Sequence, residues 1–103
     1  MGGNGYFIKD ASACIIVLSS DVKYFIEDGS AATQNILLAI HSKGLGGCWV
    51  AGDKKPYVEE VLKFIDAPPN LKLVSLIAVG YPDEKPDMKK PDLDKVLFWE
   101  RMK

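Results

Sequence analysis

Residue types that bind metals or form disulfides are scarce in this sequence. It contains two cysteines, Cys14 and Cys48, and a single histidine, His41. The wide separation of the cysteines matches no zinc or redox motif, and these three residues cannot complete a zinc site unless carboxylates join them. We therefore expect no metal, two small buried thiols in a reducing compartment, and a partly exposed helical position for His41.

Long apolar runs and charge excess are also lacking. No apolar stretch is long enough to span a bilayer, and the N-terminus lacks the features of a signal peptide. The 13 basic and 14 acidic residues give a net charge of −1 without a basic stripe, which argues against a nucleic-acid-binding surface. Hydrophobic residues make up 48% of the chain, as in ordinary globular proteins. We expect one cytoplasmic domain that contacts neither nucleic acid nor membrane.

Apolar runs separated by turn residues predict an alternation of strands and helices. The predicted elements are strands over 13–19, 48–51 and 71–80, and helices over 31–43 and from Pro56 to Ile65. The continuous apolar run over 13–19 is typical of a strand buried on both faces. This order alone favours a parallel sheet with crossover helices. A mixed sheet in an α+β fold is the alternative.

The helix over 31–43 has an unusually wide apolar surface. Asp28 and Ser30 are candidates for its N-cap. Its apolar positions are Ala32, Ile36, Ala39 and Ile40, widened by Leu37 and Leu38. Because this surface runs more than halfway round the helix, we expect it to be covered on more than one side. A partner subunit would provide the second cover.

Composition changes after residue 82. The segment that follows is charged and rich in proline, and we expect it to form neither helix nor central strand. It ends with the apolar residues Val96, Phe98 and Trp99. We therefore divide the chain into a core over 1–82 and an extended C-terminal arm over 83–103, which docks through its apolar end.

The stretch GLGGCWVAGD, residues 44–53, could hold a cofactor. Its glycines follow a helix and precede a strand, which is the wrong order for a Walker loop, and Trp49 stands where a dinucleotide-binding loop needs glycine. Two interpretations stay open. In one, Gly44 ends the helix and Gly46 and Gly47 form a turn. In the other, the small residues after the strand provide a backbone platform for a planar cofactor.

Four segments in order resemble the nitroreductase family: ASACIIVLSSD, DGSAATQNILLAIHSKGLGGCWVAGD, LVSLIAVGYPDEKP and LDKVLFWERMK. The resemblance implies an α+β fold with a mixed, mostly antiparallel sheet, and it replaces the parallel sheet expected above. It also implies an intertwined homodimer, joined through the helix over 31–43 and the arm, with FMN at the subunit interface. The implied reaction carries hydride from NAD(P)H through FMN to a nitroaromatic, quinone or similar acceptor.

The resemblance also assigns site residues. The backbone of Trp49, Val50, Ala51 and Gly52 would face the flavin ring near N5 and O4, where N–H donors stabilise developing charge. Hydride transfer is the chemistry of the flavin itself, so no catalytic residue is implied. Arg101 is a candidate for the FMN phosphate; the alternative is a solvated terminal charge.

The chain departs from the family in its cationic residues. The arginine-rich stretch with which family members begin is absent, and Arg101 is the only arginine. The chain thus resembles the C-terminal half of a nitroreductase, as a split or truncated gene product or a deliberately shortened chain. A separate N-terminal half would be a further partner. The alternative function is a non-catalytic dimerising or flavin-binding remnant.

Overall fold

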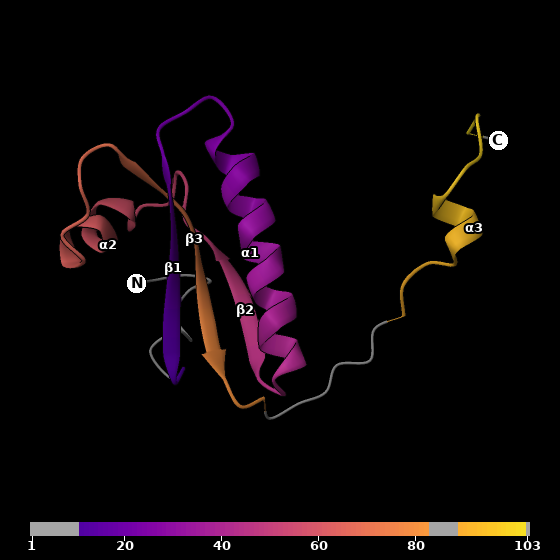
Figure 1. The fold of residues 1–103 in the computed structure, drawn as a ribbon, viewed down its shortest axis with the longest axis horizontal. Coiled ribbons are helices and arrows are strands. Elements are labelled where there is room, and N and C mark those ends of the chain that lie inside the picture. The colour runs from indigo at the N-terminus through magenta and orange to yellow at the C-terminus, as the bar shows by residue number, and fades with distance from the viewer. Residues whose placement is uncertain (1–10, 83–88, 103) are drawn as a thin grey trace.

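The structure, a computed structural model, describes residues 11–82 and 89–102. Its strands are β1 (Ala13–Ser20), β2 (Gly46–Ala51) and β3 (Leu71–Gly80), and its helices are α1 (Phe25–Ser42), α2 (Val58–Phe64) and α3 (Leu93–Val96). The strands form one sheet in the order β1-β3-β2. Figure 1 shows α1 and α2 against the sheet, with α3 apart from both. The fold is α+β, as expected from the resemblance.

The central strand β3 runs antiparallel to both of its neighbours. Ala13 of β1 and Gly47 of β2 lie opposite Val79 at one end of β3. The parallel sheet favoured by element order alone is therefore wrong. A parallel crossover must travel the full length of a strand, and α2, with 7 residues, is only about 10 Å long. The chain instead turns back and re-enters the sheet from the end at which β2 leaves it.

Each face of the sheet carries its own apolar cluster. On the α1 face the buried members are Val17, Ile40, Val74 and Ile77. On the α2 face they are Val50, Tyr57, Leu73, Leu76 and Ala78. The pairing of β1 with β3 shifts between Val17 and Leu18. At this bulge the adjacent residues Val74 and Ser75 both contact the α1 side, which a regular strand would not allow.

Helix α1 and β3 approach each other closely. A Cβ on Gly29 would lie 2.5 Å from a methyl carbon of Val74, so only glycine fits there. One turn later the hydroxyl of Thr33 donates to the Gly29 carbonyl at 2.7 Å and lies 2.8 Å from the Ser75 hydroxyl. Thr33 has one proton to donate, so Ser75 is the donor of the second bond. Both side chains are fully buried.

The start of α1 differs from the predicted start. The helix begins at Phe25, with Tyr24 as its N-cap residue and no side-chain cap, so the N-cap roles predicted for Asp28 and Ser30 are wrong. The segment before residue 31 belongs to the helix itself. Glu27 and Asp28 lie in its first turn, where their charge interacts favourably with the helix dipole.

The buried stripe of α1 also differs from the predicted stripe. Gly29, Thr33 and Ile40 are its buried residues, and Ile36 and Leu37 pack against the same cluster. Ala32 and Ala39 are exposed instead, and Leu38 is 58% exposed. Small and hydroxyl-bearing residues face the sheet because helix and strand approach so closely. The apolar back of the helix has no cover among the described residues.

Strand β1 is less buried than its sequence suggests. It forms one edge of the sheet, and Val17 is its one buried residue, so burial on both faces is wrong. The cysteines are exposed rather than buried. Cys14 of β1 and Cys48 of β2 both pair with Ala78 of the central strand, one on each side of it. Two strand spacings put them about 10 Å apart, which is too far for a disulfide. His41 is exposed on α1 as predicted.

The C-terminal arm leaves the body of the protein. Residues 83–88 lie outside the described part of the chain. Residues 93–96 form the short helix α3, so the expectation of no helix is wrong at these positions. The radius of gyration is 16.4 Å, compared with about 13 Å for a compact domain of 100 residues, and Figure 1 shows that the arm extends away from the sheet. Within the two described ranges, no helix is both long and apolar enough to cross a membrane.

Candidate functional site

The predicted cofactor segment lies on the open edge of the sheet. Among residues 11–82 and 89–102, strand β2 pairs with β3 and with no other strand. The N–H of Gly52 donates to the carbonyl of Val74 at 3.1 Å. In an antiparallel pair, consecutive residues turn their backbone groups alternately toward and away from the partner strand. Val50 therefore faces β3, and the N–H and carbonyl groups of Trp49 and Ala51 face the open edge.

The side chains of this segment divide between the two faces of the sheet. Val50 is 5% exposed and belongs to the α2-face cluster. Trp49 lies opposite Ile77, which places its indole on the α1 face, where it is 39% exposed. Ala51 is exposed. The segment thus presents a half-exposed aromatic ring and a small residue beside the backbone groups that point away from β3.

Gly52 is explained by the packing of the fold. A Cβ at this position would lie 2.7 Å from the Cγ of Leu73, so the strand end could not approach β3 with any other residue. Its N–H is already bonded to Val74. Of the four residues assigned by resemblance, only Trp49 and Ala51 direct backbone donors to the open edge. Contact of the four with a flavin stays a prediction.

The glycines between residues 44 and 47 have two different roles. Gly44 has a φ of +76°, the N–H of Gly44 bonds the His41 carbonyl, and that of Leu45 bonds the Ile40 carbonyl. These bonds form a Schellman motif, so the predicted helix end at Gly44 is confirmed. The predicted turn at Gly46 and Gly47 is wrong, because both residues belong to β2. A Cβ on Gly47 would lie 3.0 Å from Leu37, so α1 packs closely over this strand.

Tyr57 joins the site although the sequence analysis did not identify it. Its ring is 9% exposed within the α2-face cluster. Its hydroxyl donates to the Ala51 carbonyl in a short hydrogen bond. Burial raises the pKa of this hydroxyl above its ordinary value. In the sequence, the signal for this role was a tyrosine next to Pro56 at the start of an amphipathic helix. The hydrogen bond to Ala51, however, depends on the path of the loop between β2 and α2.

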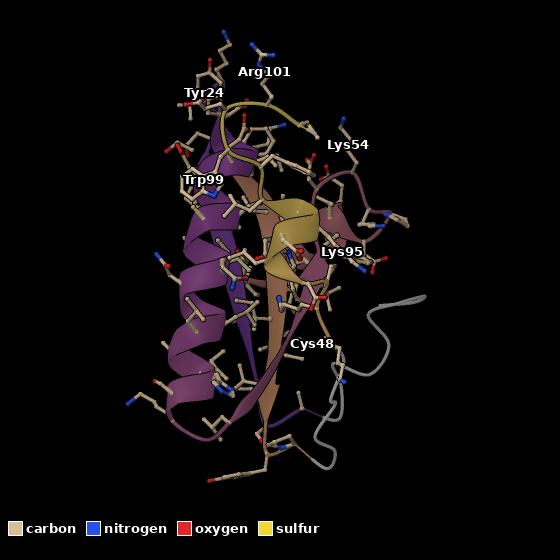
Figure 2. All side chains as sticks on the ribbon, turned by 90° about the vertical axis from the view of Figure 1, so that its right-hand side faces the viewer. Tyr24, Cys48, Lys54, Lys95, Trp99 and Arg101 are labelled. Atoms are coloured by element: carbon tan, nitrogen blue, oxygen red, sulfur yellow. The ribbon has the colours of Figure 1, made fainter. Side chains whose placement is uncertain are left out.

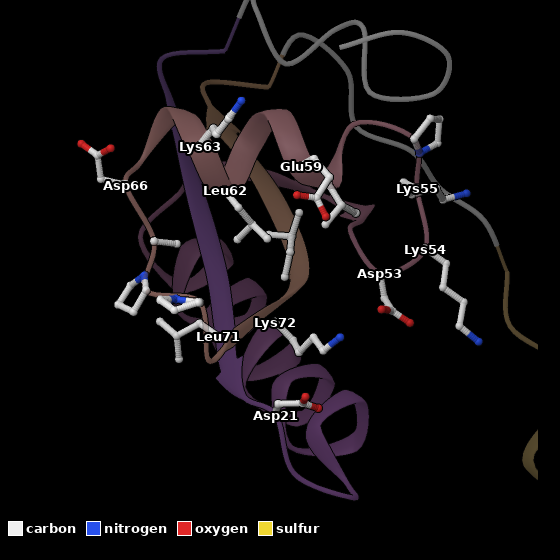
Figure 3. A pocket seen from close by; sticks show the side chains of 16 residues that line it. Asp21, Asp53, Lys54, Lys55, Glu59, Leu62, Lys63, Asp66, Leu71 and Lys72 are labelled. Carbon is white, nitrogen blue, oxygen red and sulfur yellow. The ribbon is translucent and has the colours of Figure 1, made fainter.

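A cavity of about 950 Å³ lies beside α2 (Figure 3). Its apolar part includes Leu62, Leu71 and Leu73. Its charged lining residues are Asp21, Asp53, Lys54, Lys55, Glu59, Lys63, Asp66 and Lys72. The acidic and basic residues are equal in number, so the cavity has no excess of positive charge for a phosphate group.

Arg101 is not brought together with β2 in this chain. It is exposed in the arm, and Figure 1 shows the C-terminal end far from the sheet. Figure 2 views the molecule along the direction that superimposes the arm on the sheet, so the arm lies in front of the sheet in that view by projection only. Lys54 has a φ of 61°, which is uncommon for a residue with a Cβ.

The donor chemistry of the edge suits one part of FMN better than the other. Backbone N–H groups at Trp49 and Ala51 match the acceptor atoms of a flavin ring edge, and the indole of Trp49 adds an aromatic surface. The phosphate needs cations, and near this segment the lysines Lys54 and Lys55 are accompanied by Asp53. The segment therefore fits the ring of FMN, and the phosphate needs further cationic groups.

Comparison with known proteins identifies the family of this chain. The model of the nitroreductase family matches residues 2–81. A protein of Methanothermobacter thermautotrophicus, with the provisional name NADH dehydrogenase/NAD(P)H nitroreductase, is 37% identical over 104 residues, which cover 92% of this chain and 54% of that protein. The chain thus spans about half the length of this relative.

Solved structures agree with this match. An FMN-dependent nitroreductase from Clostridium difficile superposes with a TM-score of 0.82 at 25% identity, over 97% of this chain and 64% of that one. An iodotyrosine deiodinase bound to FMN and 3-iodo-L-tyrosine superposes with a TM-score of 0.72 at 31% identity, over 93% of this chain and 50% of that one. By sequence and by fold, this chain belongs to the nitroreductase family.

Proposed function

We propose that this chain contributes the ring-binding strand of an FMN-dependent oxidoreductase, which transfers hydride from NAD(P)H to a nitroaromatic, quinone or similar acceptor. The observation that carries the proposal is the open edge of β2, with the backbone groups of Trp49 and Ala51 directed away from β3. Membership of the nitroreductase family supports it. So does FMN in the names of two structural neighbours.

The residues of the chain bind and orient rather than react. The N–H groups of Trp49 and Ala51 donate hydrogen bonds to acceptors at the ring edge, and buried Val50 fixes the strand on which they lie. When bound, FMN supplies the hydride-transfer chemistry. The protein therefore needs no acid or base of its own at this point, and we assign no catalytic residue.

In this proposal a homodimer buries the exposed apolar surface and supplies positive charge for the FMN phosphate. Apolar residues are exposed on the back of α1 at Leu38 and along the arm. The exposed arm residues are Leu93, Val96, Leu97, Phe98, Trp99 and Met102. Exposed apolar surface of this extent marks an interaction site. An arm laid on a second copy would bury these residues and carry Arg101 toward the partner's FMN phosphate. A separate N-terminal half is the alternative source of phosphate-binding cations.

The first experiment is a titration of the purified chain with FMN, followed by flavin fluorescence and by oxidation of NADH and NADPH. Saturable quenching at micromolar FMN, with turnover of an acceptor such as menadione or nitrofurazone, is expected. A chain that neither quenches FMN nor oxidises NAD(P)H, with or without an added N-terminal half, would contradict the proposal.

A second candidate is a dimerising or flavin-binding module without turnover. It is favoured by the balanced charge of the cavity beside α2 and by the distance of Arg101 from β2 within one chain. A dimer in sedimentation that quenches FMN but does not oxidise NAD(P)H would support this candidate. Measurable turnover would remove it.

A further inference from the structure

The ring of Tyr57 is fixed independently of its hydroxyl. It is 9% exposed and packs with Val50, Leu73 and Leu76 in the α2-face cluster. The residue is also the N-cap of α2, and its carbonyl accepts the N–H of Val61 at 3.0 Å. Core packing and the start of the helix therefore hold the ring, and through it they determine where the hydroxyl lies.

The hydroxyl of Tyr57 takes the place that a strand would take on the open edge of β2. It donates to the Ala51 carbonyl, which faces away from β3. The next backbone group, the N–H of Gly52, donates to Val74 of β3 at 3.1 Å. The peptide that joins Ala51 to Gly52 is thus held at its oxygen by a side chain and at its nitrogen by the sheet. Two opposed bonds leave this peptide plane little freedom to rotate.

We propose that Tyr57 is a positioning residue for the flavin-binding edge. By holding the Ala51 carbonyl, it fixes the peptide plane that ends β2, directly next to the peptide that carries the Ala51 N–H. This inference rests on the proposed function, because that N–H is one of the two donors assigned to the ring. The raised pKa of Tyr57 keeps its hydroxyl protonated, and therefore a donor, at neutral and moderately alkaline pH.

The matched variants are Tyr57→Phe and Thr33→Val. The first keeps the ring and removes the hydrogen bond to Ala51. The second removes a buried hydroxyl on the opposite face of the sheet, where Thr33 bonds Gly29 and Ser75. Tyr57→Phe loses one hydrogen bond and Thr33→Val loses two, so a general loss of stability affects both. Only Tyr57→Phe alters the end of β2.

The test combines FMN titration with amide hydrogen exchange on the full chain. For Tyr57→Phe we expect about tenfold weaker FMN binding and altered quenching and absorption of the bound flavin. We also expect the substitution to raise the exchange rate of the Gly52 amide about tenfold more than that of the Ile77 amide, after correction for global stability. For Thr33→Val we expect unchanged flavin spectra and uniform changes in exchange. Equal effects of the two variants, or an unchanged Gly52 amide in Tyr57→Phe, would overturn the inference.

Failure of the proposed function is recognised separately. If the unaltered chain binds no FMN, the proposal that this chain binds the flavin ring fails. The exchange of Gly52 without flavin still decides whether Tyr57 fixes the peptide that follows Ala51. Faster exchange confined to that peptide confirms the positioning, and unchanged exchange refutes it.

Discussion

Strand β3 and the C-terminal arm are both rich in apolar residues, yet their environments are opposite. Every residue from Leu73 to Ala78 is buried, because β3 has a strand on each side and a helix over each face. All residues described in the arm, 89–102, are exposed. Apolar composition therefore indicates that a segment will be buried but not which molecule will bury it. The partner of β3 is its own chain, and the proposed partner of the arm is a second copy.

The largest expected effect tests burial within the chain. Ile77→Ala removes a fully buried side chain from the α1-face cluster, and we expect it to lower the free energy of unfolding by about 3 kcal/mol. Urea denaturation followed by circular dichroism measures this loss. The control is Leu97→Ala in the arm, where the side chain is 45% exposed. At concentrations where the chain is monomeric, the control should cost less than about 0.5 kcal/mol. Similar losses for both variants would erase the distinction between β3 and the arm.

The second prediction concerns the polar contact between β3 and α1. Thr33→Val keeps the shape of the side chain but leaves the buried Ser75 hydroxyl without its partner. An unsatisfied buried hydroxyl costs about 1–3 kcal/mol, so we expect a loss of about 2 kcal/mol in the same denaturation experiment. Thr33→Ser keeps the hydroxyl and should recover much of the loss. A stable Thr33→Val variant would mean that apolar packing alone holds α1 on β3.

The sequence predicted β3 well because its signal is local. The run over 71–80 is continuous, apolar and ended by Tyr81-Pro82, and the structure has the same bounds. The Gly44 helix end was equally local. The register and direction of the strands depend instead on contacts between segments distant in sequence. The edge position of β1 and the exposure of Cys14 and Cys48 followed from that arrangement.

The site was predicted only in part for the same reason. The resemblance identified Trp49 to Gly52, but the direction of each backbone group depends on the bond from Gly52 to Val74. The role of Tyr57 requires the loop that returns its hydroxyl to Ala51. The buried stripe of α1 was misjudged because Gly29 and Thr33 are not apolar side chains, and only the close approach of β3 selects them.

The third prediction tests whether the arm has a partner. The double variant Phe98→Ala/Trp99→Ala removes two exposed aromatic side chains, which in the proposed dimer would be buried contacts. We expect the dissociation constant of the dimer, measured by sedimentation equilibrium, to rise at least tenfold, or about 1.4 kcal/mol. Unfolding of the monomer at high dilution should not change. A chain that is monomeric before and after the change would leave the arm without the proposed partner.

The smallest expected effect concerns pH and the α2 face. Because burial raises the pKa of Tyr57 above its value in the unfolded chain, the folded state holds the hydroxyl proton to higher pH. The stability linked to this group is fully present below the unfolded pKa of about 10 and is lost as pH rises through the folded pKa. Denaturation at pH 8 and at pH 11 should therefore show a larger decrease for the unaltered chain than for Tyr57→Phe, which has no proton to lose. Equal decreases would mean that other groups, outside the contact between Tyr57 and Ala51, govern the alkaline stability.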